Sequence, residues 1–340
     1  MYELKFDEKT CETCPTADCL SRCQYIDIDK DIAKTEIKKM ISGEDSFVLH
    51  DCVTCYACEE YCKRGNHPFY LITDLQEERG ILPMPKPLKT QFVNISVPTR
   101  RDIIQFYGAE EPVISLCLFP QYTRLFSEDK FFEELSIIIG RYFFCHLMYL
   151  HSGNPSLIRE KLPTIIENIA NHGFKEVIFF HDECYSTLTS YATAYGIEVP
   201  FKPIHFNDFL YNRLKEQQEK IQPLNAKVAF QRNCSARLTP NVEYLVDDIF
   251  NLIGVERVER KYDRENALCC GGVIRGQQRY DLFIDVQTRN VDDMVNAGVE
   301  YCVFQCPACF DYLSEKVAEK GIKPIMMHEL CLLALQGRDK

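Results

Sequence analysis

The sequence lacks an excess of positive charge, a membrane-spanning apolar run and a nucleotide-binding glycine loop. Its 340 residues include 39 lysines and arginines against 50 aspartates and glutamates, which gives a formal net charge of -11. Because nucleic-acid binding needs clustered Lys and Arg, this balance disfavours a nucleic-acid partner and suits docking to basic partners. No GxGxxG motif joins a strand to a helix, so we expect no flavin or nicotinamide site.

Hydrophobic segments that would target or anchor the chain are also missing. The first ten residues, MYELKFDEKT, are charged and lack the apolar core of a secretory signal. The most apolar stretch, residues 135–150, contains Arg141 and is shorter than the roughly 20 residues that cross a bilayer. We therefore expect a cytoplasmic protein without a membrane span.

Cysteine is abundant, with 18 residues, although thiols in the cytosol rarely form structural disulfides. Metal ligation explains such a content better. Eight cysteines precede residue 63, none lies between residues 63 and 116, and ten follow. The gap contains the proline-rich segment LPMPKPLKT, which favours an extended connection. We interpret residues 1–80 as one domain and residues 81–110 as a linker.

The eight amino-terminal cysteines form two runs. The second run has the CxxCxxCxxxC spacing of a bacterial ferredoxin, and the first run is slightly wider. In such proteins three cysteines of a run hold one cluster and the fourth reaches the other. One predicted 4Fe-4S cubane is held by Cys11, Cys14, Cys19 and Cys62. The other is held by Cys52, Cys55, Cys58 and Cys23.

This amino-terminal segment departs from a simple ferredoxin in two ways. The proline that usually follows the fourth cysteine is missing from both runs, and about 28 residues separate the runs. The insertion includes DIAKTEIKKMISG, which has a helical pattern. We expect an all-helical two-cluster module, with zinc as the alternative to iron.

After residue 110, strand-like runs alternate with helical patterns. The runs are EPVISLCLF, KEVIFFH, IEVPFKPI, KVAFQRNC, VEYCVFQC and IKPIMMH. Their alternation with helices predicts an α/β fold with parallel sheets. VEYCVFQCPACFDYL and IKPIMMHELCLLAL also parallel KEVIFFHDECYSTL and FKPIHFNDFLYNRL, which indicates an internal repeat. We predict two pseudo-repeated domains, at residues 111–214 and 224–340.

The second repeat contains a regular cysteine pattern. One cysteine is followed after 34 residues by a CysCysGly segment and after 35 more by CysProAlaCys. The five cysteines are Cys234, Cys269, Cys270, Cys306 and Cys309. The pattern resembles the CCG, or cysteine-rich, domain of heterodisulfide reductases. Together with the two-cluster module, the chain is similar to the D-type subunit of heterodisulfide reductases, to glycolate oxidase iron-sulfur subunits and to the anaerobic glycerol-phosphate dehydrogenase electron-transfer subunit.

The resemblance implies that these five cysteines hold a noncubane 4Fe-4S cluster and form the catalytic site. Cys234 and Cys306 end predicted strands and Cys309 opens a helix, and such positions favour ligand binding and thiolate formation. Gly271 and Gly272 would let the backbone pass close to the sulfurs. The alternative is a zinc-ribbon-like site with a spare cysteine.

The first repeat retains only part of this pattern. A shift of 125 residues places Phe144 on Cys269, so the first repeat cannot supply five thiolates. The residues that fall on or near the other cysteines are Cys117, Cys145, His181 and Cys184. Three thiolates and an imidazole can hold zinc tetrahedrally. Zinc, an empty site of buried residues and an iron-sulfur species remain open alternatives.

Three further residues are of types that can bind metal, and we interpret them as structural. His205 and His328 take equivalent places at the strand ends of the two repeats, where they would line the interface between them. We expect both to be structural histidines with satisfied hydrogen bonds. Cys331 lies within LCLLAL and is expected in the core.

We expect an iron-sulfur oxidoreductase subunit of the heterodisulfide reductase type. The resemblance implies that electrons pass through two cubanes to the noncubane cluster, where a disulfide such as the coenzyme M and coenzyme B heterodisulfide is reduced or formed. Redox partners of the flavoprotein, hydrogenase or formate dehydrogenase type would supply the electrons. The alternatives are a non-catalytic subunit that feeds electrons to another enzyme, including reductive activation of a metalloenzyme, and a structural zinc protein.

Overall fold

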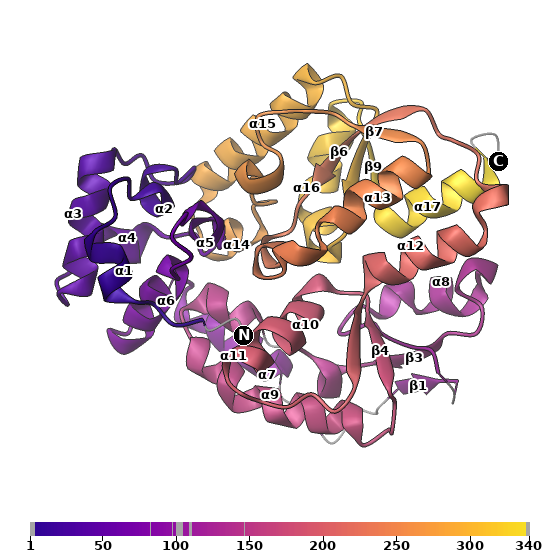
Figure 1. Ribbon diagram of the computed structural model, residues 1–340, viewed down its shortest axis with the longest axis horizontal. Coiled ribbons are helices and arrows are strands. Elements are labelled where there is room, and N and C mark those ends of the chain that lie inside the picture. Colours follow the sequence, from indigo (N-terminus) through magenta and orange to yellow (C-terminus); the bar gives the residue numbers. More distant parts are fainter. Residues whose placement is uncertain are drawn as a thin grey trace.

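The computed structural model describes residues 4–81, 83–96, 98–99, 105–108, 111–145 and 147–337. Residues 4–80, called the helical module, fold into helices at the left of Figure 1. These are α1 (Glu8–Glu12), α2 (Asp18–Ser21), α3 (Lys30–Ile41), α4 (Phe47–Asp51), α5 (Ala57–Tyr61) and α6 (Pro68–Glu78). The helix expected in the insertion is confirmed as α3, which begins after Asp29 because that carboxylate accepts hydrogen bonds from two backbone N–H groups of the first turn.

The segment expected as an extended linker contains a helix, α7 (Lys86–Ser96). The expectation of an extended connection is therefore wrong for these residues. Pro87 is the second residue of α7, where a backbone N–H has no partner within the helix, so the proline removes no helical hydrogen bond. Residues 82, 97, 100–104 and 109–110 of the predicted linker lie outside the described residues.

Residues 105–216, called the first half, form a five-stranded sheet with the order β1-β3-β2-β4-β5. Strands β2 to β5 are parallel, and β1 pairs with β3 in the antiparallel direction. The strands are β1 (Gln105–Tyr107), β2 (Val113–Ser115), β3 (Ser136–Ile139), β4 (Glu176–Phe179) and β5 (Lys202–His205). The helices are α8 (Thr123–Glu128), α9 (Pro155–Ala170), α10 (Asp182–Ser186), α11 (Ala192–Ala194) and α12 (Phe206–Glu216).

Residues 226–336, called the second half, form a four-stranded parallel sheet with the order β7-β6-β8-β9. The strands are β6 (Ala226–Gln231), β7 (Val255–Arg257), β8 (Tyr301–Phe304) and β9 (Lys323–Met326). The helices are α13 (Tyr244–Leu252), α14 (Gly272–Gly276), α15 (Tyr280–Asn296), α16 (Pro307–Glu319) and α17 (Met327–Gln336). The order matches β3-β2-β4-β5 of the first half, and the predicted α/β class with parallel sheets is confirmed.

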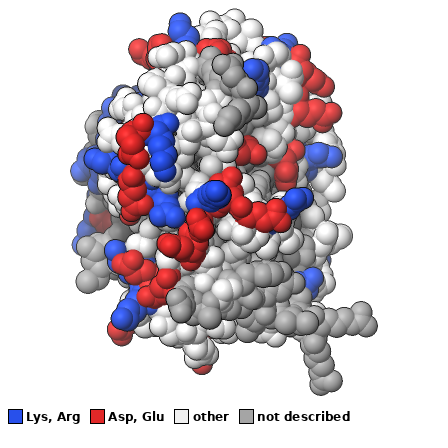
Figure 2. All heavy atoms as spheres, turned by 90° about the vertical axis from the view of Figure 1, so that its right-hand side faces the viewer, with Lys and Arg blue, Asp and Glu red and all other residues white. Residues whose placement is uncertain are grey.

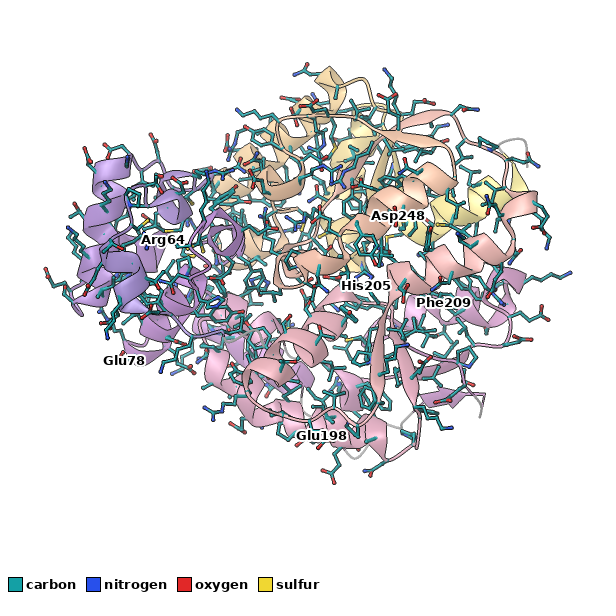
Figure 3. The ribbon with its side chains drawn as sticks, in the orientation of Figure 1. Arg64, Glu78, Glu198, His205, Phe209 and Asp248 are labelled. Carbon is teal, nitrogen blue, oxygen red and sulfur yellow. The ribbon has the colours of Figure 1, made fainter. Side chains whose placement is uncertain are left out.

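The two predicted structural histidines do not occupy equivalent positions. Strands β4 and β8 begin 125 residues apart, whereas β5 and β9 begin 121 residues apart. His205 therefore ends β5, while His328 is the second residue of α17. His205 bonds Asp182 at 2.7 Å, and Figure 3 shows it near the junction of the halves. His328 packs among aromatic rings of the first half, and its Nε2 has no hydrogen-bond partner in the described part of the chain.

One apolar core joins the two halves. It includes Ile114 and Phe206 of the first half and Phe230 and Phe304 of the second, and Cys331 lies in it as expected. A second core joins the sheet of the first half to Tyr56 of the helical module. The three parts therefore pack as one body (Figure 1).

The surface and the helices agree with the composition. Acidic and basic side chains are interspersed on the face shown in Figure 2, without a continuous basic patch. Over the described ranges, no helix combines the length and apolar character needed to cross a membrane.

Candidate functional site

The five CCG-type cysteines of the second half line one cavity of about 900 Å³. They are Cys234, Cys269, Cys270, Cys306 and Cys309. Side chains of the first half and of the segment around α7 complete the wall. Folding therefore brings the whole set to a single place that a small molecule can share.

Strand ends and one helix start position three of these thiols. Cys234 opens a short 3-10 turn, η7 (Cys234–Leu238), soon after β6 ends. Cys306 is the residue that caps α16, and Cys309 lies in the first turn of that helix. Pro307 takes the first helical position, which proline favours because its ring already has the helical φ. The CPAC segment therefore turns two thiols toward the cavity at the carboxyl end of β8.

Two glycines shape the loop that presents Cys269 and Cys270. Gly271 has a φ of +96°, and a Cβ there would lie 2.6 Å from the ring of Phe283. A Cβ on Gly272 would lie 2.7 Å from the ring of Tyr312. The backbone at these two glycines therefore lies so close to the two rings that neither position has room for a side chain. The Gly271 N–H also donates to Cys269 Sγ at 3.3 Å, which meets the expectation that the backbone approaches a sulfur.

Hydrogen bonds among the five thiols make two of them acidic. Bonds from the Cys309 thiol, opposed by burial and assisted by His181, lower the pKa of Cys306 to about 6. The Cys269 and Cys309 thiols likewise lower the pKa of Cys270. Burial raises the pKa of Cys234. Neighbouring thiols with lowered pKa values suit iron, because thiolates are the ligands that iron binds and a metal cation compensates the negative charge that burial disfavours.

Two side chains link this cavity to the helical module. The Tyr25 hydroxyl accepts a hydrogen bond from the Cys269 N–H at 2.8 Å and also bonds the Cys55 thiol. His151 bonds Thr54 through Nδ1 at 2.9 Å, and its Nε2 lies 3.7 Å from Cys234 Sγ. Each side chain therefore touches one cysteine of the cavity and the loop of the second ferredoxin-like run.

His151 and Glu183 are site residues that the sequence reasoning missed. Their ligand atoms and Cys234 Sγ lie within 4.8 Å of one another. Burial lowers the pKa of His151 to about 4 and raises the pKa of Glu183 to about 8, so both are uncharged near neutral pH. His151 falls outside every motif in the sequence. The position of Glu183 next to Cys184 was the only available signal.

The predicted linker also supplies part of the cavity wall. Met84, Leu88 and Gln91 line the cavity. Met84 and Leu88 lie close to Gly276 of α14, and a Cβ on this glycine would be 3.5 Å from each of them. The composition of residues 81–110 indicated only a linker between domains. In the structure this segment forms part of the wall of the cavity that the five cysteines line.

Electrostatic contacts connect amino-terminal thiols that come from both runs. Burial raises the pKa of Cys11 to about 11, and Cys14 and Cys62 raise it further. Burial also raises the pKa of Cys19, with contributions from Cys62, Cys11 and Cys14. These four thiols therefore lie within electrostatic reach of one another, although they come from both runs.

The second group is arranged in the same way. Burial raises the pKa of Cys23 to about 11, with a contribution from Cys55. Burial, Cys55 and Cys23 raise the pKa of Cys52. Burial raises the pKa of Cys58, with contributions from Glu59, Cys52, Cys55 and also Cys19 of the other set. Because burial, and after it the neighbouring thiols, raise the pKa values of these cysteines, positive iron ions are the kind of occupant that would stabilise them as thiolates.

The loops around these cysteines hold strained backbone conformations. Ala17, Thr54 and Tyr56 have φ values of 52°, 55° and 62°, which non-glycine residues adopt at an energetic cost. Thr54 then donates its N–H to Cys52 Sγ at 3.3 Å. Such loops wrap around a central group and direct N–H donors at sulfurs, as iron-sulfur sites do.

A buried ion-pair network fixes the helical module to the second half. Glu60 of α5 accepts hydrogen bonds from Arg232 at 2.6 and 2.7 Å and from Arg237. Arg237 also donates to the carbonyl oxygens of Glu265 and Ala267, just before the CysCys pair. This network holds the module against the loop of the cavity.

A second group of possible ligands lies inside the first half. The ligand atoms of Cys117, Cys145, His181 and Cys184 all lie within 4.8 Å of one another, and the four residues are buried. Tetrahedral zinc with bonds of about 2.3 Å separates its sulfurs by roughly 3.8 Å, so a small contraction would complete the geometry. His181 Nδ1 is 3.9 Å from Cys184 Sγ, and its Nε2 is 3.7 Å from Cys306 Sγ. The imidazole thus lies between the two groups.

The fold and the cysteines define the class of this protein. Residues 228–314 match the family model of the cysteine-rich domain named CCG, and this range includes all five cavity cysteines. Over 311 residues the chain is 23% identical to the D-type subunit of the dihydromethanophenazine:CoB–CoM heterodisulfide reductase of Methanosarcina mazei and 22% identical to that of Methanosarcina acetivorans. Each comparison covers 81% of this chain and 74% of the relative. The chain therefore contains a region that matches the CCG cysteine-rich domain, and over most of its length it is similar to the D-type subunit of heterodisulfide reductases.

A solved structure has a similar fold. The crystal structure of a hypothetical protein from Helicobacter pylori aligns with a TM-score of 0.53 and 12% identity over 83% of this chain. This chain spans 61% of the length of that protein. At this level of identity the likeness concerns the fold alone.

Proposed function

We propose that this protein is an iron-sulfur oxidoreductase subunit that carries electrons through two 4Fe-4S cubanes to a noncubane 4Fe-4S site, where a disulfide is reduced or formed. The observation that carries the proposal is the cavity of about 900 Å³ that all five CCG-type cysteines line. The cluster would occupy part of this volume, and the apolar side chains that line the rest of the wall offer a place for a substrate.

In this proposal the helical module is a two-cluster ferredoxin-type domain. Its two cubanes are held by the crossed sets of four cysteines described above. The support is the electrostatic grouping of the thiols and the strained loops around them. Tyr25 bonds both Cys55 and the Cys269 N–H and therefore connects the second set with the cavity.

The reaction joins two electrons and two protons to a disulfide and releases two thiols, or runs in reverse. When bound, the noncubane cluster supplies single electrons and a metal or sulfur atom that binds the released thiolate. The residues of the chain hold the substrate and exclude water. Glu183 and His151, both uncharged near neutral pH, are polar groups beside Cys234 that can hydrogen-bond a substrate sulfur.

We further propose that the two halves are repeats of one CCG unit, with domains at residues 111–214 and 224–340, and that Cys117, Cys145, His181 and Cys184 hold zinc. The support for zinc is the buried tetrad of ligand atoms within 4.8 Å. The shared strand order supports the repeat.

The electrons would come from other subunits. Flavoprotein, hydrogenase or formate dehydrogenase partners in a cytoplasmic complex fit the proposal, because no dinucleotide-binding loop is present in the sequence. The relatives are named as one lettered subunit of a heterodisulfide reductase, which is consistent with an assembly of several subunits.

The test uses protein purified without oxygen and supplied with an artificial electron donor. We expect about twelve irons per chain, an EPR signal from a noncubane cluster in addition to the cubane signals, and reduction of an added disulfide. Cluster signals without any turnover would favour the alternative, a subunit that feeds electrons to another enzyme. About eight irons would remove the noncubane site from the proposal.

A further inference from the structure

The cavity beside the five cysteines has a mostly apolar wall. Apolar side chains reach it from the first half (Phe119, Phe144, Met148), from the segment around α7 (Met84, Leu88) and from the second half (Val273). Its volume of about 900 Å³ would hold the cluster as well as a substrate, and the wall beyond the cysteines is formed mostly by apolar side chains. An apolar chain is the group that gains most by leaving water for such a wall.

One end of the cavity reaches solvent beside two tyrosines. Tyr280 and Tyr312 line the cavity and are 56% and 40% exposed. Cys270, Cys306 and Cys309, in contrast, are buried. A bound molecule would therefore place its sulfur among the cysteines and its far end near the tyrosines.

Arg275 of α14 lines the cavity near this open end and is exposed. Its guanidinium carbon lies 5.9 Å from the centres of the Phe283 and Tyr312 rings. It has no carboxylate partner among residues 224–337, all of which are described. Each of the other arginines in that range has a carboxylate within 4.0 Å. An unpaired guanidinium at the wall of a cavity is a binding group for an anion.

We propose that the cavity binds thiols and disulfides that have an apolar chain ending in a single acidic group, and that Arg275 pairs with this group. The inference rests on the proposed function, because it assigns the substrate class of the same site. Arg275 is a specificity residue in this proposal. It contacts the far end of the substrate and takes no part in the chemistry at the sulfur.

The scarcity of basic side chains on the cavity wall limits how acidic the substrate can be. Among the described residues that line the cavity, Arg275 is the sole lysine or arginine. A second or third anionic group on the substrate would be buried without a partner, which costs free energy. Compounds with several charges should therefore bind more weakly than those with one.

The test titrates the anaerobic, cluster-loaded protein with three thiols and follows the EPR signal of the noncubane site. Mercaptohexanoate has a six-carbon chain and one carboxylate, mercaptohexanol has the same chain without charge, and mercaptosuccinate has two carboxylates on a short chain. We expect mercaptohexanoate to perturb the signal at the lowest concentration. Arg275→Gln should weaken its binding roughly tenfold, while the binding of mercaptohexanol should not change.

Two further variants serve as controls. Arg275→Lys keeps the charge and should retain part of the affinity for mercaptohexanoate. Arg264→Gln changes an exposed arginine that does not line the cavity and should have no effect. The cubane signals of every variant should match those of the unchanged protein, which shows that folding is intact.

The outcomes separate this inference from the function on which it rests. If mercaptohexanoate and mercaptohexanol bind alike, or if Arg275→Gln changes neither, the role of Arg275 is wrong while the thiol site remains. Tighter binding of mercaptosuccinate would overturn the limit to one acidic group. If no thiol perturbs a noncubane signal that is present, both this inference and the disulfide chemistry fail.

Discussion

The two α/β halves share a strand order and differ in what they enclose. In the second half, five cysteines line a cavity of about 900 Å³ that reaches solvent. In the first half, Cys117, Cys145, His181 and Cys184 form a closed group in which all four residues are buried. The same strand order therefore accompanies an open cavity in the second half and a closed group of possible ligands in the first half.

Two residue changes account for much of this difference. Phe144 takes the place that aligns with Cys269, and its ring lies in the wall of the cavity. His181 takes the place that aligns with Cys306, and its imidazole lies between Cys184 and Cys306. The first half, with three thiols and an imidazole, thus supplies part of the wall for the second half, with five thiols, and under the proposed function the second holds the reactive site and the first a structural metal.

A substitution at Cys270 is the most severe test of the contrast between the two halves. We expect Cys270→Ser to remove the noncubane centre, so that iron falls from about twelve to about eight per chain, with zinc unchanged. Metal analysis together with EPR measures both values. Cys302→Ala is the matched control, because Cys302 is buried on β8 outside the cavity and should leave the iron content intact. Full iron content in Cys270→Ser would refute the assignment.

The first half should respond in the opposite way. Cys184→Ala removes one of four ligands and should lower zinc from about one per chain to none, while all three iron signals persist. The melting temperature should also fall, because bound metal stabilises the folded state. Cys331 lies in the core outside both groups of ligands, so the Cys331→Ala variant should retain the zinc of the first half. Unchanged protein that contains no zinc would contradict the proposed contrast between the halves.

The contacts of the helical module with each half sharpen the comparison. Glu60→Ala would leave the buried Arg237 without a carboxylate partner and Arg232 with Glu243 alone, and we expect a loss of about 3–5 kcal/mol in the free energy of unfolding. Urea denaturation measures this loss. A loss below about 1 kcal/mol would mean that the network does not hold the module.

The Glu60 carboxylate should also make the free energy of unfolding depend on pH. Although burial opposes it, Arg232 and Arg237 hold the pKa of Glu60 below its ordinary value of about 4.3. The stabilisation is therefore fully present above that value and is lost as the pH falls below it. The difference in stability between the unchanged protein and Glu60→Ala should shrink in acid.

The contact of the helical module with the first half should contribute least to the free energy of unfolding. Glu77 of α6 accepts hydrogen bonds from the Ser156 N–H at 3.0 Å and from Asn154, where α9 begins without a side-chain cap of its own. Glu77→Ala should cost about 1 kcal/mol, as the loss of a helix cap does. Glu77→Gln keeps an acceptor oxygen and should cost less. An equal loss in both variants would show that charge, not capping, matters.

Several elements could be predicted because their signals are local. Helix α3 follows from the apolar spacing after Asp29, and strands β4, β6 and β8 follow from continuous apolar runs. Strand β7 was missed because it has three residues, of which two are charged. Helix α7 was missed because its neighbouring prolines indicated an extended chain, although a proline in the first turn permits a helix.

The sequence by itself determined the cysteine runs and their spacing, since the spacing within a run depends on local chain geometry. It also determined the α/β class, because alternating apolar runs and helical patterns have few other solutions. Tertiary structure alone decided that α7 covers the cysteines, that His151 and Tyr25 reach them from separate segments, and that Arg275 lies at the cavity wall without a carboxylate partner in the second half. Those features depend on contacts between residues far apart in the chain, which no local pattern encodes.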